Sequence, residues 1–110
     1  MNAYLILLIA ITLEVCGTML LPASKGFTQL KPTLLLLTAY AVGFFLLTTI
    51  VQKLPLVTIY ALWSGLGIFS VAILGAVIYH QTLNWQTVTG LFLIVAGVTI
   101  VSLYKTHTLS

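Results

Sequence analysis

The sequence predicts an all-α integral membrane protein whose four transmembrane helices form a single domain over residues 1–110. Of the 110 residues, 61% are hydrophobic and only 5% are charged, whereas soluble domains carry about 25% charged residues. A membrane-spanning helix needs about 20 predominantly apolar residues. The chain therefore has room for four spans with short loops in a lipid bilayer, and for no separate soluble domain.

The first predicted span runs from Tyr4 to Leu21 and contains Glu14, the only acidic residue of the chain. A carboxylate at the centre of a bilayer costs roughly 2.5 to 3.5 kcal/mol, so an isolated one is expected to be functional. A glutamate that is bonded to a neighbouring helix for structure alone is the alternative. A cleaved secretory signal is disfavoured because no lysine or arginine precedes the run.

Three further apolar segments follow, and each is long enough to cross the membrane. They cover residues 33–51, 56–79 and 85–104. Because the connections between them are short, consecutive helices are predicted to be antiparallel neighbours.

The lysines predict how the chain inserts. Lys53 and Lys105 lie on one side of the four predicted spans, and Lys25 and Lys31 lie on the other. Orientation follows the lysine and arginine bias of short loops, and here the bias is absent. We therefore expect insertion both ways up, so that two copies form an antiparallel, dual-topology homodimer like the inverted repeats of many transporters.

The face of the first span that carries Glu14 consists of small and apolar residues. At helical offsets of three, four and seven it contains Leu7, Ala10, Ile11, Gly17 and Thr18. A neutral, protonated Glu14 is tolerated by the membrane, whereas a charged one favours a cation. The segment therefore predicts competition between protons and a cationic ligand at Glu14.

Aromatic residues on two other spans are predicted to line a chamber around this carboxylate. Tyr40 and Phe44 share one face of the second span, and Tyr60, Trp63 and Ser64 share one face of the third. Aromatic rings attract organic cations by roughly 0.5 to 2 kcal/mol each. Packing of helix against helix is the alternative interpretation, and for Phe44 the two are evenly balanced.

Four glycines in the last two spans indicate bends or close contacts. Gly65 and Gly67 permit a kink or a close crossing in the third span. Gly90 and Gly97 lie on one face of the fourth, which has no ionisable group and is expected to contact the same segment of a second chain. Packing within one chain is the alternative for this pair.

Several function classes are excluded by composition. The chain has four lysines but no arginine, and no basic patch that would bind nucleic acid. His80 and His107 have no further metal ligands at suitable spacing, so neither a metal nor another cofactor is expected. Cys16, the only cysteine, is expected to be a packing residue. One carboxylate without a nearby histidine does not predict an enzyme.

Two motifs complete the pattern: YALWSGLG from Tyr60 to Gly67 and GLFLIVAGV from Gly90 to Val98. Together with Glu14 and the four short spans, they resemble the small multidrug resistance transporters over essentially the whole chain. The resemblance implies proton-coupled export of lipophilic and quaternary cations by antiparallel homodimers in the bacterial inner membrane.

The same resemblance assigns roles residue by residue. It implies proton and substrate binding for Glu14, a substrate chamber containing Tyr40, Tyr60 and Trp63, and a dimer contact through Gly90 and Gly97. Less specifically, it places six more residues along the pocket. These are Leu7, Ala10, Ile11, Gly17, Thr18 and Ser64.

Two alternatives stay open beside drug export. The guanidinium-exporting branch of the family usually has tryptophan and threonine where this chain has Gly17 and Ser64, which favours the polyspecific branch. The other alternative is a non-transporting partner subunit of a heterodimeric transporter. Pro22 and Lys25 depart from the family pattern in the first loop.

Overall fold

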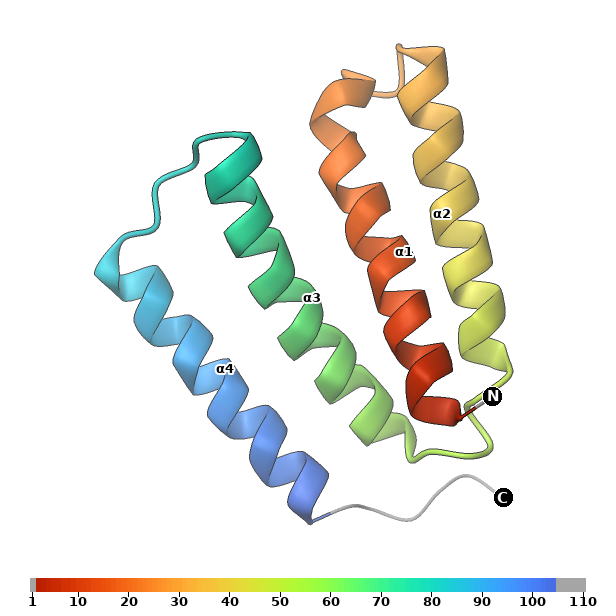
Figure 1. Ribbon diagram of the computed structural model, residues 1–110, viewed down its shortest axis with the longest axis vertical. Helices are drawn as coiled ribbons and strands as arrows, with labels where there is room; N and C mark the ends of the chain where they lie inside the picture. Colours follow the sequence, from red (N-terminus) through yellow and green to blue (C-terminus); the bar gives the residue numbers. More distant parts are fainter. Residues whose placement is uncertain (1, 105–110) are drawn as a thin grey trace. The chain divides into compact units, whose positions relative to one another are not determined.

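The computed structural model describes residues 2–104, and these form four α-helices and no strand. The helices are α1 (Ala3–Ser24), α2 (Leu30–Thr48), α3 (Leu56–Ile78) and α4 (Trp85–Leu103) (Figure 1). Each is long and apolar enough to cross a membrane. The predicted all-α architecture with four spanning helices is therefore confirmed. Lys105 and His107, which entered the predictions above, lie outside the described residues.

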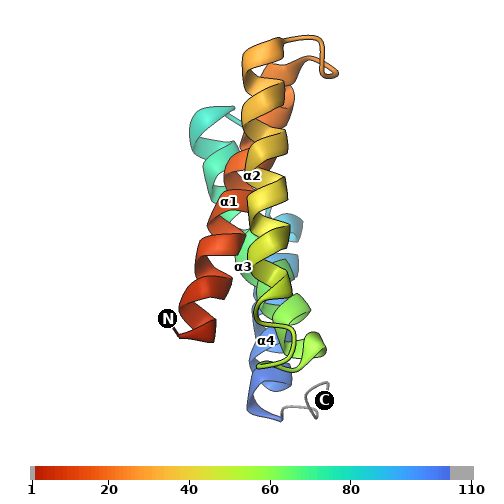
Figure 2. The same ribbon diagram turned by 90° about the vertical axis from the view of Figure 1, so that its right-hand side faces the viewer.

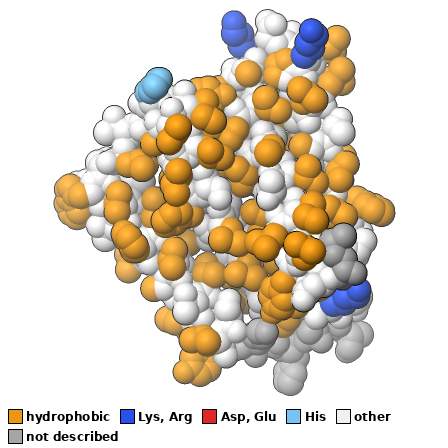
Figure 3. Space-filling view, viewed as in Figure 1, with side chains coloured by type: hydrophobic (Ala, Val, Ile, Leu, Met, Phe, Trp, Pro, Cys, Tyr) orange, Lys and Arg blue, Asp and Glu red, His pale blue; other side chains and the backbone are white. Residues whose placement is uncertain are grey.

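The helices form two antiparallel pairs, and each pair is a compact unit. One unit comprises residues 1–50 with α1 and α2, and the other comprises residues 51–110 with α3 and α4. Figures 1 and 2 show α1 and α2 side by side from both directions. Hydrophobic side chains are spread across the face shown in Figure 3, whereas Lys25, Lys31 and Lys53 lie at helix ends or between helices. This distribution suits helices whose middles contact lipid.

Helix α1 extends beyond the predicted span by one turn. The Asn2 side chain caps its start by accepting a hydrogen bond from the Tyr4 backbone N–H at 2.8 Å. The helix continues through Pro22 to Ser24 and ends at Lys25, whose backbone is left-handed with φ 48°. A proline so near the end removes only one helical hydrogen bond, so it does not stop the helix.

Helix α2 lies three residues nearer the N-terminus than the predicted segment at both of its ends. Pro32 is tolerated because it lies in the first turn, where N–H groups have no helical partner. At the other end, the Thr48 and Thr49 hydroxyls donate to the carbonyls of Phe45 and Leu46, each at 2.6 Å. These bonds compete with the helical ladder and end the helix before the apolar sequence ends.

Helices α3 and α4 end close to the predicted positions. Asn84 caps α4 by accepting from the Thr87 N–H at 2.8 Å. The connection after α3 turns at His80, whose φ of 55° is left-handed, and the Gln81 N–H donates to the Gly75 carbonyl at 3.2 Å. A left-handed residue at this place satisfies carbonyls at the end of the helix.

Candidate functional site

A series of hydrogen bonds connects the only carboxylate of the chain to a tyrosine on the neighbouring helix. The Thr18 hydroxyl donates to Glu14 Oε1 at 3.0 Å. The same Thr18 oxygen lies 2.9 Å from the Tyr40 hydroxyl, where either group can be the donor. Glu14 and Thr18 are one helical turn apart on α1, and Tyr40 lies in the middle of α2. All three side chains are half-buried.

Glycine at position 17 allows Tyr40 to take this place. A Cβ atom on Gly17 would lie 2.8 Å from Tyr40 Cε1, 3.0 Å from Cδ1 and 3.3 Å from the Leu36 carbonyl oxygen. Real Cβ atoms essentially never approach another heavy atom within 3.0 Å. The tyrosine ring therefore occupies the space that any side chain at position 17 would need.

Three of the predicted pocket residues on α1 are more deeply buried than Glu14. Leu7, Ala10 and Ile11 are almost completely buried, at 1%, 0% and 4% exposure. Beside them, a Cβ on Gly43 of α2 would lie 3.3 Å from the Ala10 carbonyl oxygen, so the two helix backbones approach closely here. In this chain these three predicted pocket residues lie in packed surroundings, whereas Glu14 and Thr18 keep partial exposure.

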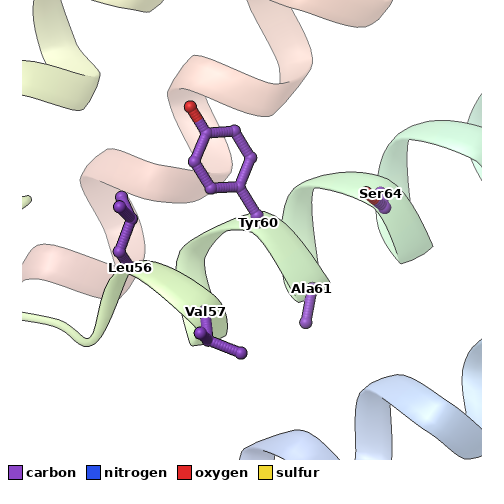
Figure 4. A pocket seen from close by; sticks show the side chains of 5 residues that line it. All are labelled: Leu56, Val57, Tyr60, Ala61 and Ser64. Atoms are coloured by element: carbon purple, nitrogen blue, oxygen red, sulfur yellow. The ribbon is translucent and has the colours of Figure 1, made fainter. Parts of the chain in front are cut away.

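The predicted chamber residues of α3 lie around a surface hollow. A hollow of about 450 Å³ is lined by Tyr60 and Ser64, together with Leu56, Val57 and Ala61. Figure 4 shows Leu56 and Tyr60 pointing to one side of the helix, and Val57 and Ala61 pointing to the other. Tyr60 is 52% exposed. An exposed ring beside a hydroxyl is suited to contact a bulky ligand.

The two remaining aromatic candidates differ in exposure. Phe44, one turn after Tyr40 on α2, is 55% exposed, whereas Trp63 on α3 is half-buried. Tyr40 is connected to Glu14 through Thr18 within the pair α1 and α2. Tyr60, Trp63 and Ser64 lie on α3, in the other pair.

The four glycines singled out from the sequence occupy two environments. A Cβ on Gly65 would lie 2.8 Å from Val98 Cγ2, so α3 and α4 cross closely at this point. Gly67 is also buried, and α3 is a continuous helix through both positions. In contrast, a Cβ on Gly90 or Gly97 would meet nothing within 4 Å. These last two positions are open on α4.

The sequence did not predict which side chains meet across the helices. The contacts between Thr18 and Tyr40, and between Gly17 and the Tyr40 ring, depend on the register of α1 against α2. A second hollow, of about 290 Å³ between α3 and α4, was also missed; Ser70 and Thr99 are its polar lining residues. Small residues at helical spacing were the only available signal for such close approaches.

The chemistry of the site follows from its partners. Within residues 2–104 the hydrogen-bond partner of Glu14 is a neutral hydroxyl and not a lysine. No group of three or more potential metal ligands occurs in this part of the chain. A carboxylate with this surrounding can hold a proton, or can remain charged beside a mobile cation.

Comparison with known proteins identifies the family of the chain. A profile of the family described as Small Multidrug Resistance protein matches residues 2–94. The multidrug transporter EmrE of Escherichia coli K12 is 38% identical over 108 residues, which cover 98% of each chain. The nicotine metabolites export pump subunit NepA of Paenarthrobacter nicotinovorans is 42% identical over 98 residues, covering 89% of this chain and 84% of that protein.

A third relative is named for one class of compound. The quaternary ammonium compound-resistance protein QacE of Escherichia coli is 35% identical over 103 residues, which cover 94% of each chain. These relatives are exporters and resistance proteins rather than enzymes. With four helices that can span a membrane and a family match over most of its length, the chain belongs to the small multidrug resistance family of efflux transporters, multi-pass proteins of the bacterial inner membrane.

Proposed function

We propose that this protein is a proton-coupled antiporter that exports lipophilic and quaternary ammonium cations, with Glu14 as the shared binding group for protons and substrate. The observation that carries the proposal is the environment of Glu14. Its carboxylate is half-buried in a membrane-spanning helix and is bonded to the Thr18 hydroxyl, which does not neutralise its charge. A charged carboxylate in this position favours a cation or a proton, and one binding site cannot hold both.

The chamber for the organic part of the substrate contains Tyr40, Tyr60 and Trp63 in this proposal. Tyr60 and Ser64 line a hollow whose other lining residues are apolar. Rings of this kind attract quaternary cations through their electron-rich faces and accept ligands of many shapes. This chemistry suits a range of flat or bulky cations better than one small polar ion.

The proton gradient is sufficient to drive such an exchange. If two protons enter for each monovalent cation expelled, a potential of 100 mV and one pH unit supply about 7 kcal/mol. Moving the charge of the cation against the same potential costs about 2.3 kcal/mol. The remaining free energy supports a substrate gradient on the order of a thousandfold. Two Glu14 carboxylates, one from each chain of a dimer, would accommodate this stoichiometry.

The proposed assembly is an antiparallel homodimer. Gly90 and Gly97 leave open space on α4, where a second helix can approach closely. The lysines are balanced, with Lys25 and Lys31 on one side of the predicted spans and Lys53 and Lys105 on the other, which allows insertion in both orientations. One relative is described as a pump subunit, so a heterodimer is the competing assembly. A reporter fused at Ser110 should be found on both sides of the membrane. Detection on one side only would contradict dual insertion.

The decisive experiment is the binding of tetraphenylphosphonium to purified protein in detergent from pH 5 to pH 9. Protons compete with the cation for Glu14, so the affinity of the native protein should rise with pH until Glu14 is fully ionised. Glu14→Gln should lose the binding and its pH dependence. Cys16→Ser, an exposed change two residues away on α1, is the matched control and should behave as the native chain.

Two outcomes would overturn the proposal. If binding does not depend on pH, or if Glu14→Gln binds the cation normally, the carboxylate is not the shared site. If Glu14→Gln fails to assemble, the carboxylate serves assembly, as in a non-transporting partner subunit. Guanidinium in place of tetraphenylphosphonium separates the two transport hypotheses, because a small hydrogen-bonding cation gains little from exposed aromatic rings.

A further inference from the structure

The hydrogen bonds among Glu14, Thr18 and Tyr40 have a direction, because the Thr18 hydroxyl carries only one proton. When Thr18 donates to Glu14 Oε1, the contact of 2.9 Å between the Thr18 and Tyr40 oxygens can only be a bond donated by Tyr40. With Glu14 ionised, all the hydroxyl groups therefore point toward the carboxylate. The Tyr40 oxygen then presents only its lone pairs to the surroundings.

Protonation of Glu14 Oε1 reverses this direction. The new carboxyl O–H donates to the Thr18 oxygen, which frees the Thr18 O–H to rotate toward the Tyr40 oxygen, 2.9 Å away. The Tyr40 oxygen becomes an acceptor, and its O–H turns away from Thr18. No proton moves between residues in this step; one proton enters at Glu14 and two hydroxyl groups rotate.

From this geometry we propose that Thr18 is a positioning residue that transmits the protonation state of Glu14 to Tyr40, and that Tyr40 thereby changes the dipole it presents to a cation. The inference rests on the proposed function of Glu14 and deepens it. In the ionised state the tyrosine oxygen attracts a cation, and in the protonated state its O–H repels one. A single protonation therefore weakens cation binding on two helices at once.

The surroundings of the three residues allow this coupling to be isolated. On α1 the other titratable groups are Tyr4 and Cys16, and on α2 they are Lys31 and Tyr40 itself. Lys31 lies in the first turn of α2, at one end of the pair. Tyr40 is the one of these four groups that the structure joins to Glu14 through a hydrogen-bonded intermediary.

The test follows Tyr40 directly by NMR of protein labelled with ¹³C at the tyrosine Cζ position, a nucleus that senses whether the hydroxyl donates or accepts. The Tyr40 resonance, assigned by its loss in Tyr40→Phe, should move with pH in step with the ¹³C signal of the Glu14 carboxyl. In Thr18→Val this movement of the Tyr40 signal should be lost while the Glu14 signal still titrates. Thr18→Ser, which keeps the hydroxyl, should retain the movement.

Thr12→Val is the matched control, because Thr12 is an exposed threonine of α1 that donates to the Leu8 carbonyl and not to another side chain. It should leave the Tyr40 response unchanged. If Thr18→Val does not fold, Thr18→Ala carries the same expectation, and Glu14→Gln must fix the Tyr40 signal at every pH.

The possible results separate the two proposals. If the Tyr40 signal moves equally in native protein and Thr18→Val, or does not move while Glu14 titrates, the coupling through Thr18 is wrong and the antiporter proposal is unaffected. If Glu14 shows no titration and cation binding shows no pH dependence, the proposed function fails and the coupling fails with it.

Discussion

The two helical pairs differ in how they treat polar groups. In the pair α1 and α2, three half-buried polar side chains bond to one another between the helices. In the pair α3 and α4, the buried hydroxyls of Thr58 and Ser102 have no hydrogen-bond partner. A buried, unpaired hydroxyl costs roughly 1 to 3 kcal/mol, whereas a paired one is tolerated. The first pair therefore satisfies the polar side chains between its helices, whereas the second pair leaves two buried hydroxyls unpaired.

The pairs also differ in how much of each helix is covered. Helix α1 has six buried residues, whereas α4 has only Leu91 among the described ones. Phe92, Leu93 and Leu103 of α4 are each more than 60% exposed. Such a surface must face lipid or another chain, because it cannot face water. The hydrogen-bonded polar residues around Glu14 thus lie in the first half of the sequence, and the surface that we propose for the dimer contact lies in the second.

The largest effect on stability and cation binding is expected from Gly17→Ala, a substitution in the pair α1 and α2. The added Cβ would lie 2.8 Å from the Tyr40 ring, so the ring must shift, which we expect to weaken its bond to Thr18. Overpacking of this kind costs about 1 to 3 kcal/mol, which urea unfolding in mixed micelles would measure. Tetraphenylphosphonium affinity should fall about tenfold, a loss of about 1.4 kcal/mol. Unchanged affinity would show that Tyr40 does not contribute to the site.

Thr58→Val, in the pair α3 and α4, is expected to raise the stability instead of lowering it. The variant removes a buried hydroxyl without a partner and keeps the shape of the side chain. Stability should rise by about 1 kcal/mol, whereas the same threonine-to-valine change at Thr18 should remove hydrogen bonds that the native site makes. Unfolding of the two variants under identical conditions makes the comparison. A loss of stability in Thr58→Val would show that its hydroxyl has a partner.

The smallest effect on folding is expected from Gly97→Ala, since nothing lies within 4 Å of the added Cβ. Alanine is a better helix former than glycine by up to about 1 kcal/mol, so the single chain should become slightly more stable. Gly65→Ala is the matched control, because its Cβ would lie 2.8 Å from Val98. The larger Gly97→Leu should weaken dimer formation in detergent, measured by light scattering, if α4 forms the contact. If Gly97→Leu dimerises like the native protein, the dimer contact does not involve this face of α4.

Much of the architecture was predictable from hydropathy alone. Four apolar segments must become helices, because a bilayer offers no water to satisfy exposed backbone groups. The ends of α1 and α2 were predicted less well, because Pro22 and Pro32 suggested boundaries. Pro32 lies in the first turn of α2, where an N–H has no helical partner, and Pro22 lies in the last turn of α1, where it removes a single helical hydrogen bond. The helices therefore continue through both prolines.

The members of the candidate site were predictable from the sequence, but the contacts between them were not. Glu14 follows from composition, since a single carboxylate in a chain of 110 residues that is 61% hydrophobic has few explanations other than function. The family resemblance is confirmed by the match over residues 2–94. The burial of Leu7, Ala10 and Ile11 was not predicted, because helical spacing places residues on one face without saying what covers that face.

The sequence by itself determined the membrane environment, the four helices and the position of the carboxylate, because these depend on local hydropathy and on residues near in the chain. Only the tertiary structure decided that Thr18 meets Tyr40, that the tyrosine ring fills the space beside Gly17, and that Gly65 lies at a close contact between helices whereas Gly97 does not. These contacts depend on how one helix is rotated and shifted against the next. Many weak side-chain contacts across the two helices set that register together, and no single motif encodes it.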